Sequence, residues 1–397
     1  MKEHFVSSNI KYSCENENFF KNDIKLLNEN GEDIDFTLFK SYIQKETSNF
    51  IHQSYNNIII LVGAGASVVC ANNEIDSRYG KTVAMLAESI NNSLKEESEC
   101  FSLQELADLC KYSIAVEIEG NKLNPLFNLE DFLSYLISFE KYVSNEIHDK
   151  YVKSKNKIFE LIVFNTKYEY DNTCMKHSAV INTISHIVRA PSKLTLVTTN
   201  YDTLIEDAAD SIEYTVMDGF TFTHRPHFDS DMYEWNLVKD IENVKTREME
   251  YKKNIINLLK LHGSLTWERN GKKIYRKEKC DVSTPIMIFP SSDKYMQSYQ
   301  EPYFELFTKF QELLKRPNTL LITAGFSFAD NHISQMIVQA ILHNKSLATL
   351  ITDFSINQDN DNWKKLEELM QHNYKVAFLK ATMNTDLMDY LGEYYDD

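Results

Sequence analysis

A continuous run of five apolar and mostly β-branched residues, Ile58 to Val62, is followed directly by the glycine-rich segment Gly63-Ala64-Gly65-Ala66-Ser67. Uninterrupted runs of this kind are typical of strands that are buried on both faces of a parallel sheet. Glycines after such a strand permit a tight turn and a close approach of the backbone to another group, because side chains are missing. The pattern predicts a central strand of an α/β sheet with a turn at its carboxyl end.

Three further strand-like runs, each followed by a polar or glycine-containing motif, are Leu194 to Thr198 with Thr199-Asn200-Tyr201-Asp202, Asn257 to Leu261 with His262-Gly263-Ser264, and Thr319 to Thr323 with Gly325-Phe326-Ser327. The carboxyl ends of parallel strands meet at one edge of a sheet, where α/β folds bind ligands, so we expect the four motifs to lie together. Their order points to a nucleotide site.

The strand signals alternate with helical periodicity, which implies βαβ units. More strand signals occur at Ile286 to Phe289, Leu347 to Thr352 and Lys375 to Leu379. We therefore predict an α/β fold, a Rossmann-like parallel sheet with helices on both faces, together with a helical insert subdomain.

Changes in this periodicity divide the chain into three parts. Residues 1–50 are polar apart from an amphipathic stretch from Phe36 to Ile43, and we interpret them as an N-terminal extension. Residues 81–190 have the period of helices, including the capping-box pair Ser102 and Glu105, and form the predicted insert. Residues 51–80 and 191–397 are predicted to form the Rossmann-like domain.

Composition narrows the class of protein. The formal charge of −16 disfavours direct binding to nucleic acid, because affinity for phosphate backbones comes largely from Lys and Arg. The six cysteines form no C-x-x-C pair, which argues against a zinc site or a disulfide framework and indicates a reducing compartment. Met1 to Phe20 lacks the apolar core of a signal peptide, and the longest mainly apolar run, Ile58 to Val69, is too short to span a bilayer. We expect a cytoplasmic protein without a metal or a membrane contact.

Two glycine-containing turns are candidate anion sites. The turn from Gly63 to Ser67 could approach a pyrophosphate, or it could serve only to pack strand against helix, and its spacing is compatible with both. Gly325 and Ser327 precede an amphipathic helix and form the second candidate. Asp330 is most simply the N-cap of that helix.

Three polar side chains are candidates for chemistry. Asn200 and Asp202 should emerge beside the glycine turn, although Asn and Asp also cap helices, and Thr203 with Glu206 fits a capping box. His262 should be exposed at a turn, in the position that a general base needs, although a lone histidine is more often structural.

Taken together, Gly63-Ala64-Gly65-Ala66-Ser67, Thr199-Asn200-Tyr201-Asp202, His262-Gly263 and Gly325-Phe326-Ser327 resemble the sirtuin superfamily motifs in their usual order. Sirtuin deacylases carry a zinc module of paired cysteines that is missing here, and they have an Asp-Phe-Arg core where this chain reads Ile75-Asp76-Ser77-Arg78. The helical insert and the run from Gly325 to His332 look more like the sirtuin-like NADases of bacterial anti-phage defence.

This resemblance implies cleavage of NAD+ between nicotinamide and ribose, giving nicotinamide and ADP-ribose and depleting cellular NAD+. By motif, His262 would act as the base, Asn200 would position water and ribose, and Asp202 would orient the ribose. The implied NAD-binding residues are Gly63, Ala64, Gly65, Ala66, Ser67, Thr199, Gly263, Gly325 and Ser327. No metal is implied.

The chain length and the lack of a recognisable sensor domain make the chain similar to the subunit that pairs with a HerA-type ATPase in two-gene defence systems. That likeness implies a large homo-oligomer and an ATPase partner. Two other functions stay open: a protein deacylase or ADP-ribosyltransferase that uses the same NAD site, and a sensor that binds NAD or ADP-ribose without turnover.

Overall fold

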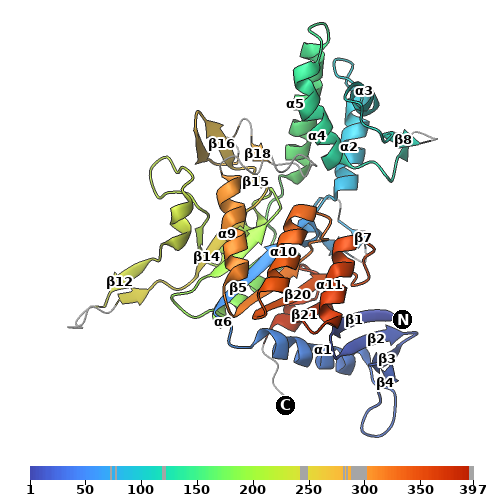
Figure 1. Ribbon diagram of the computed structural model, residues 1–397, viewed down its shortest axis with the longest axis vertical. Coiled ribbons are helices and arrows are strands. Elements are labelled where there is room, and N and C mark those ends of the chain that lie inside the picture. The colour runs from blue at the N-terminus through green and yellow to red at the C-terminus, as the bar shows by residue number, and fades with distance from the viewer. Residues whose placement is uncertain are drawn as a thin grey trace.

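The computed structural model describes residues 1–71, 74–76, 78–118, 122–241, 249–279, 282, 285–287 and 302–392. Its centre is one eleven-stranded sheet (Figure 1). Seven parallel strands run in the order β11 (Thr215–Met217), β14 (Ile255–Lys260), β10 (Leu194–Thr198), β5 (Asn57–Val62), β19 (Thr319–Ala324), β20 (Leu347–Asp353) and β21 (Val376–Lys380). The sheet continues with antiparallel pairing through β1 (Lys2–Ser7), β2 (Lys11–Glu15), β3 (Asn18–Lys21) and β4 (Ile24–Lys25).

Successive residues of β5 point into two different cores. Ile58, Ile60 and Val62 pack into the core on one face, and Ile59 and Leu61 pack into the core on the other. The first face is covered by α1 (Phe36–Ile51), α6 (His177–Ile187), α7 (Leu204–Ser211) and α12 (Leu387–Leu391), and the second by α9 (Tyr303–Lys315), α10 (Asn331–His343) and α11 (Asp361–Gln371). The predicted Rossmann-like fold, with a central β-branched strand and helices on both faces, is confirmed.

Most of the predicted strands occur within one or two residues of their predicted bounds, and one of them lies outside the main sheet. Of the run Ile286 to Phe289, Ile286–Met287 forms β18, which among the described residues pairs with β15 (Gly263–Ser264) in a separate two-stranded sheet. Residues 288 and 289 lie outside the described residues. The sequence pattern also missed β11, because a strand of three residues is too short to show a period.

The N-terminal residues extend the main sheet. After β1 to β4, Asp35 caps α1 through a hydrogen bond from the Leu38 amide (2.8 Å). Within the predicted amphipathic stretch, Phe39 and Ile43 are buried and Phe36 is exposed, which is the pattern of a helix that packs on one side.

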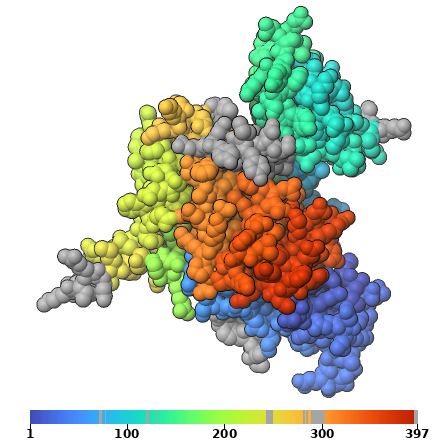
Figure 2. Space-filling model, viewed as in Figure 1, coloured from blue at the N-terminus to red at the C-terminus, as the bar shows by residue number. Residues whose placement is uncertain are grey.

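Four of the described helices between β5 and β10 form a separate lobe with its own core (Figure 2). They are α2 (Val83–Glu96), α3 (Leu103–Leu109), α4 (Leu129–Phe139) and α5 (His148–Thr166). The predicted capping box of Ser102 and Glu105 is present at the start of α3. The predicted insert also includes α6, which instead packs Val180, Ile181 and Ile184 into the sheet core. The boundary of the insert near residue 190 stays a prediction.

Short elements complete the described chain: η1 (Ala64–Ser67), β6 (Cys70–Ala71), β7 (Glu74–Ile75), β8 (Glu117–Ile118), β9 (Lys122–Leu123), η2 (Glu140–Tyr142), η3 (Ser230–Glu234), β12 (Val238–Asp240), β13 (Met249–Tyr251), β16 (Trp267–Asn270) and β17 (Lys273–Arg276). The hairpin of β12 and β13 projects from the body (Figure 1). No helix in the described ranges combines the length and the apolar character that spanning a bilayer requires.

Candidate functional site

The four sequence motifs follow the carboxyl ends of four strands that are neighbours in the sheet. Their order is β14, β10, β5 and β19. The chain passes from β5 to β10 on one side and later places β19 on the other side of β5. Such a reversal of direction opens a crevice at the carboxyl ends of the strands, which is where open α/β sheets bind ligands.

The first and fourth motifs pack backbone against backbone. The Gly63 amide donates to the Ala324 carbonyl (3.0 Å), and the Gly65 amide donates to the Gly325 carbonyl (2.9 Å). A Cβ atom on Gly63 would lie 2.5 Å from the Gly325 oxygen, and Gly325 has a φ of +61°. The two turns therefore need glycine in order to touch each other, which supports the packing interpretation. A role for them in phosphate binding stays a prediction.

The second motif is hydrogen-bonded to the first. The side-chain nitrogen of Asn200, Nδ2, donates to the Gly63 carbonyl and to Ser67 Oγ, both at 3.0 Å. Ser67 Oγ in turn donates to Asp202 Oδ2 (2.8 Å). Because Asp202 and Ser67 are both buried, this chain of hydrogen bonds fixes the rotamers of all three polar side chains.

The predicted capping box at α7 is not formed. The Thr203 side chain makes no capping bond and donates instead to Asp207 (2.8 Å). Asp202 Oδ1 accepts from the Leu204 amide (3.2 Å), so Asp202 bonds the start of the helix with one oxygen and Ser67 with the other. Both roles weighed for this aspartate, helix capping and site formation, are compatible with its geometry.

A buried lysine that the sequence motifs did not include forms hydrogen bonds with this loop and with α7. Lys260 is 1% exposed, and its Nζ donates to the Asp202 carbonyl and to Glu206 Oε1, the latter at 2.9 Å. Burial raises the pKa of Glu206, and the charge of Lys260 opposes that rise. A lysine inside the apolar run of β14 was the sequence signal for this pair, since a buried ammonium needs a partner.

A second missed residue lies far away in the chain. The Asn384 amide nitrogen donates to the Ala66 carbonyl (2.9 Å) and to the Val68 carbonyl (2.8 Å). It thereby holds the glycine turn from the segment after β21. No local pattern marks Asn384, because its partners are more than 300 positions away.

His262 is 4% exposed, so the expectation of an exposed ring is wrong. The residues after it form β15, which pairs with β18 and covers the turn. The ring's Nε2 lies 3.1 Å from Oδ2 of Asp330. Asp330 is the N-cap of α10, as predicted, and its Oδ1 accepts from the His332 and Ile333 amides. His262 is therefore joined to the fourth motif, whereas Asn200 and Asp202 are joined to the first.

The remaining predicted binding residues differ in their positions. The amide of half-buried Thr199 donates to the Val62 carbonyl (3.2 Å), which ties the second motif to β5. Gly263 has a φ of +91°, and a Cβ there would lie 2.1 Å from the Ile286 oxygen. Ala64 is exposed at the turn, whereas Ala66 is buried. Ser327 is exposed, with its Oγ accepting from the Ala329 amide, and it joins none of the hydrogen-bond chains above.

The loop that departs from the deacylase pattern holds its own ion pair. The Arg78 guanidinium binds the Asp76 carboxylate, with Nη2 2.6 Å from Oδ2, and the Arg78 side chain is largely exposed. Because water surrounds the arginine and screens its charge, this ion pair contributes little to stability. Ser77 lies outside the described residues.

No group of three or more His, Cys, Asp or Glu side chains is placed to hold a metal ion in the part of the chain that the structure describes. Five cysteines, Cys14, Cys70, Cys100, Cys110 and Cys174, are free thiols. Cys280 lies outside the described residues. The prediction that the protein uses no metal stays a prediction.

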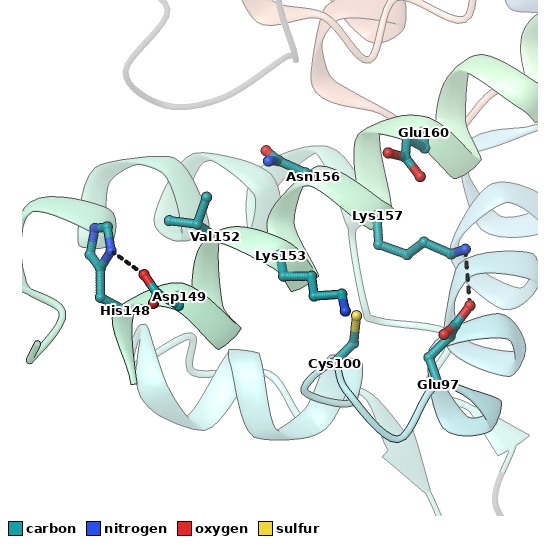
Figure 3. Close-up of a pocket in the computed structure, with 9 residues that line it drawn as sticks. All are labelled: Glu97, Cys100, His148, Asp149, Val152, Lys153, Asn156, Lys157 and Glu160. Atoms are coloured by element: carbon teal, nitrogen blue, oxygen red, sulfur yellow. Dashed lines mark ion pairs between the residues drawn. The ribbon is translucent and has the colours of Figure 1, made fainter. Parts of the chain in front are cut away.

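Two hollows lie away from the four motifs. One, of about 490 Å³, runs along α5 in the insert, where Lys157 pairs with Glu97 and His148 with Asp149 (Figure 3). The other, of about 590 Å³, lies at the amino ends of β10 and β14, beside the β12–β13 hairpin. Neither is lined by a motif residue. We assign the first hollow no role.

Asp353 ends β20, the neighbour of β19, and burial raises its pKa to about 6. Since this value is above that of an unfolded aspartate, the carboxyl lowers stability progressively as the pH rises from about 4 to about 6. Asp353→Asn keeps an acceptor oxygen for the Ser355 amide. We expect it to raise the free energy of unfolding by about 1–3 kcal/mol at pH 7 and to change it little at pH 4. Urea unfolding at both pH values measures the change in the free energy of unfolding. An equal effect at both would contradict the raised pKa of Asp353.

The model of the SIR2-like domain family matches residues 194–379. This range runs from the first residue of β10 into β21 and contains the second, third and fourth motifs. Comparison with curated proteins gives no significant match. The match supports a sirtuin-like family for this part of the chain and indicates an activity that involves NAD.

Proposed function

We propose that this protein is an NAD+ glycohydrolase, which cleaves the bond between nicotinamide and ribose and depletes NAD+ as an anti-phage effector. The observation that carries the proposal is the joining of all four motifs at one sheet edge. Ser67, Asn200 and Asp202 form one hydrogen-bonded set, and His262 reaches Asp330 beside the fourth motif. A SIR2-like domain supplies the link to NAD.

The reaction needs little acid catalysis, because nicotinamide leaves as a neutral molecule and does not have to be protonated. Water adds to C1′ of the ribose, and the bond from C1′ to the pyridine nitrogen breaks with its electron pair going to the ring. The water proton passes to His262 and then to solvent. The protein must hold the ribose in place and stabilise the positive charge that develops at C1′.

Each proposed role agrees with how its side chain is held. Asn200 is oriented by Gly63 and Ser67 and would position the water and the ribose. Asp202, with both carboxylate oxygens engaged, would act as a fixed negative charge on the ribose side. Gly63 to Ser67 would contact the pyrophosphate, with Thr199 and Gly263 beside them, and Gly325 with Ser327 would contact the adenosine half.

Incubation of the purified protein with NAD+ tests the proposal. We expect nicotinamide and ADP-ribose in equal amounts, without an added acceptor, measured by liquid chromatography. Asn200→Ala should lower the rate by about 10²-fold, because it removes a positioned polar group. The matched control is Asn156→Ala, an exposed residue on α5.

The outcomes also separate the alternatives. Release that requires an acylated peptide, or transfer of ADP-ribose onto protein, would indicate a deacylase or an ADP-ribosyltransferase. Binding of NAD+ without release, unchanged in Asn200→Ala, would indicate a sensor.

We further propose that the protein works in the cytoplasm as a homo-oligomer that pairs with a HerA-type ATPase. The assembly proposals come from the resemblance in motifs, the chain length of 397 residues and the lack of a recognisable sensor domain, and the location comes from the cysteine pattern. Light scattering of the purified chain, alone and with such an ATPase, distinguishes these assemblies from a monomer.

A further inference from the structure

We propose that Asp330 is a positioning residue for His262, in addition to being the cap of α10. The inference rests on the proposed function, since it concerns how the base of that reaction is held. From the sequence, Asp330 was expected most simply as a helix cap.

The geometry divides the two oxygens of one carboxylate between two tasks. Oδ1 accepts from the His332 amide (3.0 Å) and from the Ile333 amide (3.3 Å), which fixes the side chain at the start of α10. Oδ2 then lies 3.1 Å from Nε2 of His262, within ion-pair distance but outside the alignment of a hydrogen bond. The two side chains are only 8% and 5% exposed, so water screens the contact weakly.

A helix cap by itself does not require this arrangement. One acceptor oxygen is enough for an N-cap, and Ser, Thr or Asn supplies it as well as Asp does. The second, charged oxygen therefore has a separate effect, which falls on His262.

The neighbouring histidine has a different aromatic neighbour. The ring of His332 lies on the ring of Phe307, with centroids 4.7 Å apart and planes at 11°. It is thus stacked against α9. His262, which follows β14, has its Nε2 3.1 Å from the carboxylate.

A carboxylate at this distance has a defined chemical consequence. It favours the tautomer that carries its proton on Nε2, which makes Nδ1 the basic nitrogen, and it stabilises the imidazolium that forms when the ring takes a proton from water. Because the cap of α10 fixes the carboxylate, its charge has a fixed position beside the ring. His262 is then preorganised as a base before substrate enters.

Asp330→Asn tests the inference, since asparagine keeps the cap but removes the charge. We expect kcat for nicotinamide release to fall about 10²-fold while KM changes less than about threefold. In a His262→Ala background, Asp330→Asn should have no further effect, because the two residues act as one unit. Asp35→Asn, which makes the same change at the cap of α1, is the matched control and should leave kcat unchanged.

Three results would overturn the inference: a wild-type kcat in folded Asp330→Asn, equal fold-losses in the wild-type and His262→Ala backgrounds, or a loss explained by unfolding on thermal denaturation. A separate readout does not depend on activity. Nitrogen chemical shifts of labelled histidine should show Nε2 of His262 protonated in the wild-type chain and a changed tautomer ratio in Asp330→Asn. A wild-type chain that releases no nicotinamide would overturn the proposed function, and the tautomer measurement then decides this inference by itself.

Discussion

His262→Ala is expected to lower the rate of nicotinamide release from NAD+ by about 10²- to 10⁴-fold, the range that a positioned general base contributes. His262 lies two residues after the end of β14, at the edge where the four motifs meet, and its Nε2 lies 3.1 Å from the Asp330 carboxylate. The substitution removes the group proposed to take the water proton. Initial rates of nicotinamide formation at saturating NAD+ measure the loss.

The experiment has to separate lost chemistry from lost stability. Removing the ring leaves the Asp330 carboxylate buried without its imidazole, which is itself destabilising. His262→Gln fills most of the same space without being a base, so it should be equally inactive and more stable. His186→Ala changes an exposed histidine of α6. It is the matched control and should keep the wild-type rate. Wild-type rates in both folded His262 variants would exclude His262 as the base.

Gly325→Ala is expected to lower the free energy of unfolding by roughly 3 kcal/mol or more, because the added methyl group both strains the backbone and clashes with its neighbours. Its φ of +61° is strained for alanine, and the new Cβ would lie 2.3 Å from the Ala66 nitrogen and 2.5 Å from the Gly65 carbonyl carbon. Both neighbours are backbone atoms, so relief requires the two turns to separate. Activity should fall with stability, because Asn200 is oriented by the Gly63 carbonyl.

Gly271→Ala provides a matched comparison. Gly271 has the same φ of +61°, but nothing lies within 4 Å of an added Cβ. It should therefore cost only the backbone strain, about 1–2 kcal/mol. Urea unfolding of the two variants isolates the clash as the difference between them. Equal costs would mean that the first and fourth motifs do not press against each other as described.

The elements that the sequence predicts well are those that local rules control. The β-branched runs of β5 and β10 are strands because such residues favour a pleated, buried surface. Ser102 and Asp330 cap helices because their side chains satisfy amides within three residues. In contrast, β1 to β4 were not predicted, because their mixed polar pattern becomes a sheet only when β1 pairs with β21.

The candidate site divides in the same way. That four motifs would gather at one edge followed from the sequence, because parallel strands all end on the same side of their sheet. The partners of each side chain did not follow. The link from Asn384 to the glycine turn and the pair of Lys260 with Glu206 depend on strand order and on loop paths.

The sequence by itself determined the fold class, the central strand and the residue types at the carboxyl edge, since periodicity and glycine turns act over short distances. Only the tertiary structure decided that His262 is buried and meets Asp330, that Asn200 meets Ser67, and that Gly63 touches Gly325. The physical reason is that a contact of about 3 Å depends on how distant segments are placed beside one another. Local pattern contains no information about that placement.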